Sequence, residues 1–443
     1  MIQTGRELAV SSIIAVLLVS TAEAVAQTPP ALRTIYSFTG GSDGSLPAAG
    51  VIVDGGVLYG TTLYGGTPGY GAVYALTQPA SPGAAWTETT LYNFTGGRDG
   101  AYPAAGVTIG TDGILYGATG GPGSLNTLGT VYSLTPPISQ GGSWTEATLY
   151  SFSGPVDGEK PFASLVVGGL PGGDPVLYGT TVSGGGCPAN LWGCGTAFAV
   201  TASGPAWTEN VLHYFDHNDG HPDADGLYPN GVVLGGDGVL VGTTFSGGTK
   251  GAGTVFLLRR PASPGGWDET AIYNFAGSGG DGANPGGGVV FGKGGVLYGA
   301  TEFGGAAGAG TVFSLTPPAF PGGVWTEAVL YSFAGGSDGQ SPVAGVAIGP
   351  GGLLYGTTMQ GGISNSTCAF NLGCGTVFSL TPPASGRGAW TKTTLHSFTG
   401  SDGYVPYGGV FVAESGTLFG TTEFGGSCSS SAAGCGTVFA LEP

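Results

Sequence analysis

Positive charge is scarce in this sequence, which has 10 lysine and arginine residues against 27 aspartate and glutamate residues. Charged residues of both signs make up only 8% of the chain, and its net charge is −17 at pH 7. A surface of that sign repels phosphate groups, and no cluster of basic residues offsets it. We therefore expect neither nucleic acid nor anionic membranes as partners.

Long apolar runs are also lacking, with one exception near the start of the chain. Leu8 to Ser20 is apolar, follows Arg6, and is too short to span a bilayer. Alanines at positions 22, 24 and 26 give an A-x-A pattern, so residues 1–26 are predicted to be a secretory signal peptide. No cysteine follows this run and no second long apolar run occurs, so we predict a secreted or periplasmic protein without a membrane span or lipid anchor.

Glycine and proline are abundant instead, with 93 glycines and 30 prolines in 443 residues. Such a composition is also found in low-complexity chains. However, 41% of the residues are hydrophobic, 11% are aromatic, and the glycines recur at a fixed period. The period indicates a folded repeat protein.

Seven copies of one unit fill the chain. Their most constant element is Leu-Tyr-Gly-Thr-Thr or a close variant, and it recurs every 57 to 64 residues, beginning at Leu58, Leu115, Leu177, Leu240, Leu297, Leu354 and Leu418. This unit is too long for a leucine-rich or hexapeptide solenoid and suits a four-stranded propeller blade.

Four strands are predicted in each unit from β-branched and aromatic runs between glycines and prolines. In the first unit, Val51–Val53 and Val57–Thr62 flank the turn Asp54-Gly55-Gly56, which is typical of a tight hairpin. The third strand begins at Gly71 and the fourth runs from Trp86 to Phe94. Equivalent third strands begin at Gly129, Gly195, Gly253, Gly310, Gly375 and Gly436, and fourth strands at Trp144, Trp207, Trp267, Trp325 and Trp390.

The two ends of the repeat region complement each other. The chain opens with a lone fourth strand, Leu32 to Phe38, and ends with a third strand, Gly436 to Leu441. If the first strand completes the last blade, the ring closes without an exposed sheet edge. We therefore predict an all-β, seven-bladed β-propeller with four strands per blade; an open β-solenoid, the alternative, needs polar caps that are not seen. The blades are expected at residues 48–94, 104–152, 162–215, 230–275, 286–333, 343–398, and 407–443 plus 32–38.

The repeat resembles a known bacterial family. Leu-Tyr-Gly-Thr-Thr, a following Gly-Gly (Gly65-Gly66, Gly304-Gly305, Gly361-Gly362) and Gly-Thr-Val-Phe-Ser-Leu-Thr-Pro-Pro are similar to the GloVer tandem repeat of choice-of-anchor proteins. This resemblance implies an exported bacterial repeat protein of uncharacterised activity. The sequence departs from the family pattern because no anchoring tail follows the repeats, so we do not predict surface attachment. A weaker similarity to kelch repeats supports the blade prediction but implies no function.

All six cysteines fall between predicted second and third strands, as near neighbours within single repeats. In an oxidising compartment this spacing predicts three local disulfides, Cys187–Cys194, Cys368–Cys374 and Cys428–Cys435. Metal ligation is the alternative, although structural zinc needs four ligands together.

The most regular polar motif is Asp-Gly-x-x-Pro, which precedes every blade. Its seven aspartates are candidate ligand-binding residues on one face of the disk: Asp43, Asp99, Asp157, Asp225, Asp281, Asp338 and Asp402. Two interpretations stay open, a ring of carboxylates that binds calcium or a hydroxyl-rich ligand, and a turn in which the carboxylate accepts backbone N–H groups.

The largest break in the repeat pattern lies at residues 216–226. His217, Asp219, His221 and Asp223 gather there, and imidazole with carboxylate suits zinc or manganese. The alternative is a solvated acidic loop. Trp192, inside the Cys187–Cys194 loop, is a candidate for stacking on a sugar ring or a partner, or else packs within its loop. His213 and His396 stand where other repeats have tyrosine, so we expect them to be strand residues.

No catalytic motif is found: there is no nucleophile elbow, zincin helix or phosphate loop. The sequence therefore favours a non-catalytic extracellular binding or interaction scaffold, with a glycan or a protein as its ligand. One alternative is a metal-assisted hydrolase or polysaccharide lyase that uses the 216–226 loop, and another is a structural surface-layer component. No cofactor is expected to be required; calcium or one transition-metal ion is the alternative.

Overall fold

The computed structural model describes residues 30–81, 83–121, 128–139, 141–169, 173–185, 194–204, 206–215, 225–260, 266–320, 322–366, 368, 372–384, 386, 388–428 and 434–443. The predicted signal peptide, Trp192, Cys187 and the four candidate metal ligands of the 216–226 loop lie outside these residues. Within them, none of the helices has the length and hydropathy needed to cross a membrane.

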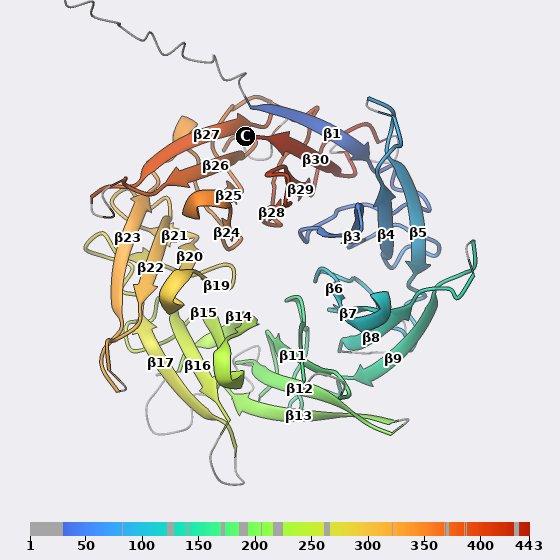
Figure 1. The fold of residues 1–443 in the computed structure, drawn as a ribbon, viewed down its shortest axis with the longest axis horizontal. Coiled ribbons are helices and arrows are strands. Elements are labelled where there is room, and N and C mark those ends of the chain that lie inside the picture. Colours follow the sequence, from blue (N-terminus) through green and yellow to red (C-terminus); the bar gives the residue numbers. More distant parts are fainter. Residues whose placement is uncertain are drawn as a thin grey trace, which may run out of the picture.

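Seven four-stranded antiparallel sheets form a ring around a central axis (Figure 1). Blade 1 contains β2 (Ile52–Asp54), β3 (Val57–Thr62), β4 (Ala72–Thr77) and β5 (Thr87–Asn93). Blade 2 contains β6 (Thr108–Ile109), β7 (Leu115–Thr119), β8 (Thr130–Thr135) and β9 (Thr145–Ser151). Blade 3 contains β10 (Val166–Gly168), β11 (Val176–Thr181), β12 (Thr196–Ser203) and β13 (Ala206–Tyr214). Blade 4 contains β14 (Leu227–Leu234), β15 (Leu240–Ser246), β16 (Thr254–Arg259) and β17 (Asp268–Asn274).

The remaining blades repeat this order. Blade 5 contains β19 (Val290–Phe291), β20 (Leu297–Thr301), β22 (Thr311–Thr316) and β23 (Thr326–Ser332). Blade 6 contains β24 (Ala347–Ile348), β25 (Leu354–Thr358), β26 (Thr376–Thr381) and β27 (Thr391–Ser397). Blade 7 contains β28 (Phe411–Val412), β29 (Leu418–Thr422), β30 (Thr437–Glu442) and β1 (Ala31–Ser37). Short 3₁₀ turns are found at Thr111–Gly113, Gly236–Gly238, Lys293–Gly295, Gly336–Asp338 and Pro350–Gly352.

The ring closes as predicted, because β1 pairs antiparallel with β30 and supplies the fourth strand of blade 7. In Figure 1 the blue strand β1 lies along the outside of the red strand β30. The prediction of an all-β, seven-bladed propeller is therefore confirmed. One feature was not expected: a small two-stranded sheet joins β18 (Gly282–Ala283) to β21 (Phe303–Gly304). β14 also begins at Leu227, ahead of the predicted start of its blade.

Close packing across each blade explains the glycine of Leu-Tyr-Gly-Thr-Thr. Gly117 of β7 lies directly opposite Tyr132 of β8, and a Cβ atom at position 117 would overlap the Tyr132 ring. Each of the other six blades has the same pair of a glycine and a fully buried aromatic: Gly60 with Tyr74, Gly179 with Phe198, Gly242 with Phe256, Gly299 with Phe313, Gly356 with Phe378 and Gly420 with Phe439.

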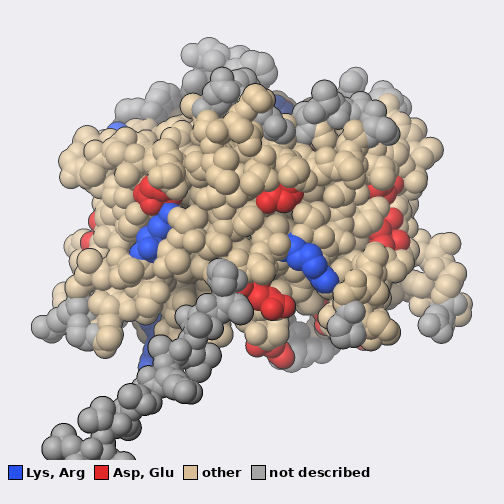
Figure 2. Space-filling view, turned by 90° about the horizontal axis from the view of Figure 1, so that it is seen from above, with Lys and Arg blue, Asp and Glu red and all other residues tan. Residues whose placement is uncertain are grey.

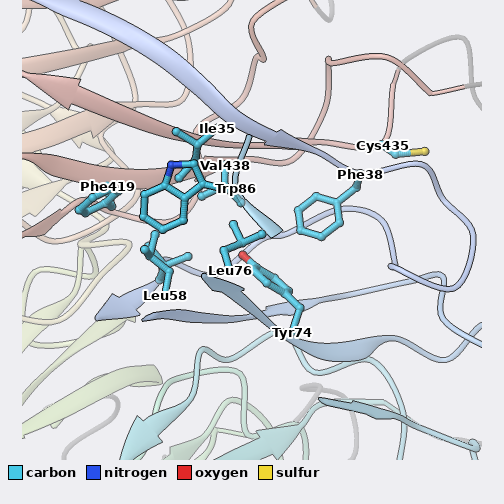
Figure 3. Close-up of a cluster of buried hydrophobic side chains, with 10 residues drawn as sticks. Ile35, Phe38, Leu58, Tyr74, Leu76, Trp86, Phe419, Cys435 and Val438 are labelled. Atoms are coloured by element: carbon cyan, nitrogen blue, oxygen red, sulfur yellow. The ribbon is translucent and has the colours of Figure 1, made fainter. Parts of the chain in front are cut away.

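Tryptophans at the start of the fourth strands join neighbouring blades. The Trp86 ring packs edge-on against Phe419 of blade 7, with 6.0 Å between the ring centroids. Around it, Figure 3 shows Ile35 and Val438 from blade 7 meeting Leu58 and other blade 1 side chains. Equivalent tryptophan contacts recur at Tyr59–Trp144, Tyr116–Trp207, Tyr178–Trp267 and Tyr298–Trp390. Each blade therefore covers one face of the next, which is why the second and third strands consist mainly of apolar residues and buried threonines.

Candidate functional site

The Asp-Gly-x-x-Pro turns shape the inner wall of the ring. In each, the residue before proline has a positive φ of 55–59°, although it is not glycine: Leu46, Tyr102, Lys160, Tyr228, Asn284, Ser341 and Val405. Leu46 illustrates what holds this conformation. Its N–H donates to the Cys435 carbonyl of blade 7, and its carbonyl accepts from the Leu63 N–H of blade 1. The turn thus links two blades and directs the following residues toward the central axis.

The motif's aspartates point to the preceding blade. Asp99 accepts hydrogen bonds from the Tyr92 hydroxyl (3.0 Å), the Thr95 N–H (2.7 Å) and the Thr95 hydroxyl (2.6 Å). Asp43 makes the same three contacts. These contacts account for the motif as a turn, and none of the seven aspartates lines the central cavity. Their ligand-binding role stays a prediction.

His213 and His396 take the tyrosine's place in two blades, as their sequence positions indicated. His213 Nε2 lies 2.9 Å from Asp225 Oδ2, and His396 Nε2 lies 2.8 Å from Asp402 Oδ2. His396 and the Thr399 amide hold the pKa of Asp402 below its usual value, against the opposing effect of burial. Both histidines are strand residues of the blade framework, in β13 and β27.

A second carboxyl group lies near several of the aspartates of the Asp-Gly-x-x-Pro motif. It belongs to the glutamate two residues after the tryptophan that precedes the fourth strand. Burial, together with the neighbouring charges of Asp157 and Asp281, raises the pKa of Glu209 and Glu327 to about 7. Blade 6 differs, because Lys392 occupies this position. Its ammonium donates to Asp338 Oδ1 (3.0 Å) and to the Asp338 carbonyl (2.6 Å).

Two of the predicted disulfides are present in the described residues. Cys368 is bonded to Cys374 and Cys428 to Cys435, with Cα–Cα distances of 5.0 and 5.5 Å. Cys194 is also disulfide-bonded; its predicted partner lies outside the described part of the chain. The candidate metal loop and Trp192 lie there as well, so both stay predictions. Among the described residues, no group of three or more His, Cys, Asp or Glu side chains is placed to hold a metal ion.

A cavity of about 1020 Å³ occupies the centre of the ring. Small residues after the motif prolines form much of its wall: Ala48, Ala49, Ala104, Ala105, Ala163, Gly231, Gly287, Gly288, Ala344, Gly408 and Gly409. The first two strands of a blade are antiparallel. The residues before the first strand and those after the second strand therefore lie at the same end of this cavity.

Large side chains gather at that end of the cavity, which we call the channel mouth. It consists of six aromatic and three charged residues: Tyr64, Tyr102, Lys160, Phe162, Tyr228, Phe245, Glu302, Tyr407 and Glu423. Phe162 and Tyr407 are 43% and 47% exposed. Tyr64 packs edge-on against Tyr102, with 5.2 Å between their ring centroids. The mouth therefore offers exposed aromatic faces above a wall of small residues.

The channel mouth was not predicted from the sequence. All of its residues except Tyr64 occupy three positions of the repeat: directly before the motif proline, directly after it, and directly after Leu-Tyr-Gly-Thr-Thr. The third position holds leucine, glycine, valine, phenylalanine, glutamate, methionine and glutamate in the seven repeats. Chemical variation at fixed repeat positions was the signal that would have identified them.

Elsewhere the surface carries few charges. On the outer wall seen in Figure 2, acidic and basic side chains are scattered singly among uncharged residues. No basic patch is visible on this side of the molecule.

Similar folds are found among solved structures at low sequence identity. A candidate 6-phosphogluconolactonase from Bacteroides uniformis ATCC 8492 is 15% identical, with a TM-score of 0.45, covering 79% of this chain and 84% of that one. The PQQ-bound aldose sugar dehydrogenase of Streptomyces coelicolor is 13% identical, with a TM-score of 0.40 and coverages of 94% and 99%. A Dyadobacter fermentans protein of unknown function is 11% identical, with a TM-score of 0.37 and coverages of 82% and 97%.

No curated protein matches this chain in sequence. One family model does match, in three overlapping segments that together span almost the whole chain, residues 24–229, 167–370 and 228–443. The resemblance to a bacterial repeat family stated from the sequence is therefore confirmed. The chain belongs to the Gloeobacter/Verrucomicrobia repeat family.

Proposed function

We propose that this protein is an extracellular binding propeller that takes a hydroxyl-rich ligand, an oligosaccharide, at its channel mouth. The observation that carries the proposal is the gathering of the chemically variable repeat positions around one end of a cavity of about 1020 Å³. A framework that is repeated seven times and varies mainly at one rim is typical of a scaffold that presents a binding site.

The exposed aromatic side chains suit a sugar ligand. Phe162 and Tyr407 are exposed aromatic side chains at the cavity, where the C–H face of a sugar ring can be buried against an aromatic ring. Tyrosine hydroxyls at Tyr102 and Tyr228 add hydrogen-bonding groups for the sugar's hydroxyls. The wall of alanine and glycine leaves space for the ligand between these side chains.

The cysteines support an extracytoplasmic location. Disulfides persist in oxidising compartments, and Cys368–Cys374 and Cys428–Cys435 each close a short loop. Together with the signal peptide expected at residues 1–26, they favour export, where polysaccharides of cell walls and matrices are the available ligands.

Binding to a panel of neutral and charged oligosaccharides tests the proposal. Wild-type protein and the variants Phe162→Ala, Tyr407→Ala and Phe320→Ala are compared by calorimetry. Phe320 is a matched control, since it is an exposed aromatic (68%) on the β22–β23 hairpin, outside the cavity lining. We expect wild type and Phe320→Ala to bind equally, and each mouth variant to bind about tenfold more weakly. Absence of binding to every oligosaccharide, or equal binding by all variants, contradicts the proposal.

A further inference from the structure

The channel mouth has two chemically different sides. Blades 2 to 4 contribute aromatic residues and one lysine: Tyr102, Lys160, Phe162, Tyr228 and Phe245. Blades 5 and 7 contribute both of its carboxyl groups, Glu302 directly after β20 and Glu423 directly after β29. Tyr407, on the link into blade 7, lies on the carboxyl side. A ligand that spans the mouth therefore meets ring faces on one side and acidic groups on the other.

Neither carboxyl group has a partner among the described residues. In the part of the chain that the structure describes, the Glu302 and Glu423 side chains take part in no hydrogen bond or ion pair. Their backbone N–H groups are used, donating to Asn284 and Val405. By contrast, the aspartates of the Asp-Gly-x-x-Pro turns accept up to three hydrogen bonds each. Two acidic groups at a cavity wall are thus left for something outside the chain.

Tyr407 and the two glutamates line the same cavity, and the charges of both glutamates act on Tyr407. Burial raises the pKa of Tyr407, and the charges of Glu423 and Glu302 raise it further. Burial also raises the pKa of Glu302, and that of Glu423 to about 7. A carboxylate that has lost water and gained no partner is unfavourable until a cation neutralises it. The phenol ring beside them provides a face for a cation as well.

We infer that the ligand carries protonated amines, which bind at the Glu302 and Glu423 carboxyl groups while its uncharged part lies against the aromatic side of the mouth. This inference rests on the proposed function and narrows its ligand class to oligosaccharides of amino sugars with free amino groups. Each ammonium donates a charge-assisted hydrogen bond to one carboxylate, so the amines rather than the sugar backbone determine the preference.

Two oligosaccharides that differ only in this group test the inference. The tetramer of N-acetylglucosamine is neutral, and its fully de-N-acetylated form carries ammonium groups on the same backbone. Both are titrated into wild type, the double variant Glu302→Gln/Glu423→Gln, and the control Glu414→Gln/Glu442→Gln. The control removes the same charge from two exposed positions away from the cavity.

We expect wild type and control to bind the amine form at least about tenfold more tightly than the acetylated form. In the mouth double variant this ratio should fall to about one, with binding of the acetylated tetramer retained as proof of folding. If wild type binds the two tetramers with equal affinity, the inference is overturned and the proposed function stands. If wild type binds neither tetramer, the inference is also overturned, and the wider oligosaccharide panel decides the proposed function. A titration with CaCl₂ completes the test: calcium binding that is lost in the mouth variant overturns the amine assignment in favour of a metal.

Discussion

At the scale of single residues, the seven blades act as internal controls for one another. Tyr74 and Tyr132 are fully buried, and their hydroxyls have no hydrogen-bond partner in the described part of the chain. The other five blades have phenylalanine at this position, opposite the same glycine. Tyr92, in contrast, donates its hydroxyl proton to the buried Asp99 carboxylate.

This contrast predicts opposite effects for one substitution. Tyr132→Phe should stabilise the protein by about 1 kcal/mol, since it removes a buried polar group without a partner. Tyr92→Phe should destabilise it by about 2 kcal/mol, because a charged acceptor loses a donor. Urea unfolding of both variants checks this, and a stabilised Tyr92→Phe would show that the Asp99 contact is not structural.

The raised pKa values of Glu209 and Glu327 make stability depend on pH. The pKa of both groups is about 7 in the folded chain and lies near the ordinary glutamate value of 4.5 when unfolded. The folded state therefore binds the proton more tightly, so their contribution to stability is complete below pH 4.5 and is lost as pH rises through 7. The pKa values of Asp338 and Asp402 are lowered, so their contribution is fully present over this range and is lost only at more acidic pH.

We therefore expect the melting temperature to fall between pH 5 and pH 8. Glu209→Gln/Glu327→Gln should flatten this dependence, since a neutral amide needs no proton. Glu414→Gln, at an exposed position, should leave the slope unchanged. Differential scanning calorimetry across this range measures the effect. A melting temperature that rises with pH in wild type would refute the assigned direction.

At the scale of elements, strand positions could be predicted because seven copies give the same evidence. The Leu-Tyr-Gly-Thr-Thr strand, the hairpin at Gly55-Gly56 and the third strand all lie within a residue or two of the expected places. The pairing of β18 with β21 could not be predicted, since it extends by one residue a backbone bridge that recurs in other blades, as at Ser45–Tyr64 and Ala101–Gly121, and does not follow from side-chain periodicity.

The channel mouth escaped prediction for a related physical reason. Repetition drew attention to Asp99 and its equivalents, yet these carboxylates satisfy amide and hydroxyl donors of the preceding blade. Binding surfaces are made where the repeats differ, as at Phe162 and Glu423. Only the three-dimensional turn, with Tyr102 at positive φ before proline, shows that these scattered positions meet at one rim.

A prediction at the scale of elements concerns the glycine that lies opposite the buried aromatic side chain in each blade. Gly117→Ala should destabilise the protein by about 1–3 kcal/mol, because its Cβ must displace the Tyr132 ring in a packed blade. Gly236→Ala is the matched control, since a Cβ there meets no atom within 4 Å. Chemical denaturation compares the two. Equal stabilities would mean that blade packing at Gly117 is loose.

At the scale of the whole molecule, the closure of the ring by β1 joins the first and last strands of the chain. A variant that begins at Thr39 leaves blade 7 with three strands and exposes the edge of β30. We expect a lower melting temperature and concentration-dependent self-association by light scattering. A synthetic peptide covering residues 30–38 should restore the melting temperature and the monomer. A shortened chain as stable as the full one would argue against the observed closure.

The central claim is that an oligosaccharide binds at the channel mouth. A structure of the mature protein with a bound oligosaccharide tests it most directly. The crystals are soaked with the tightest ligand from the panel, and the electron density is inspected around the whole ring. The account predicts ligand density in the mouth, with a sugar ring against Phe162 or Tyr407 and polar groups toward Glu302 and Glu423. Density only on the outer wall or on the cysteine-containing loops, with the mouth empty, would contradict it.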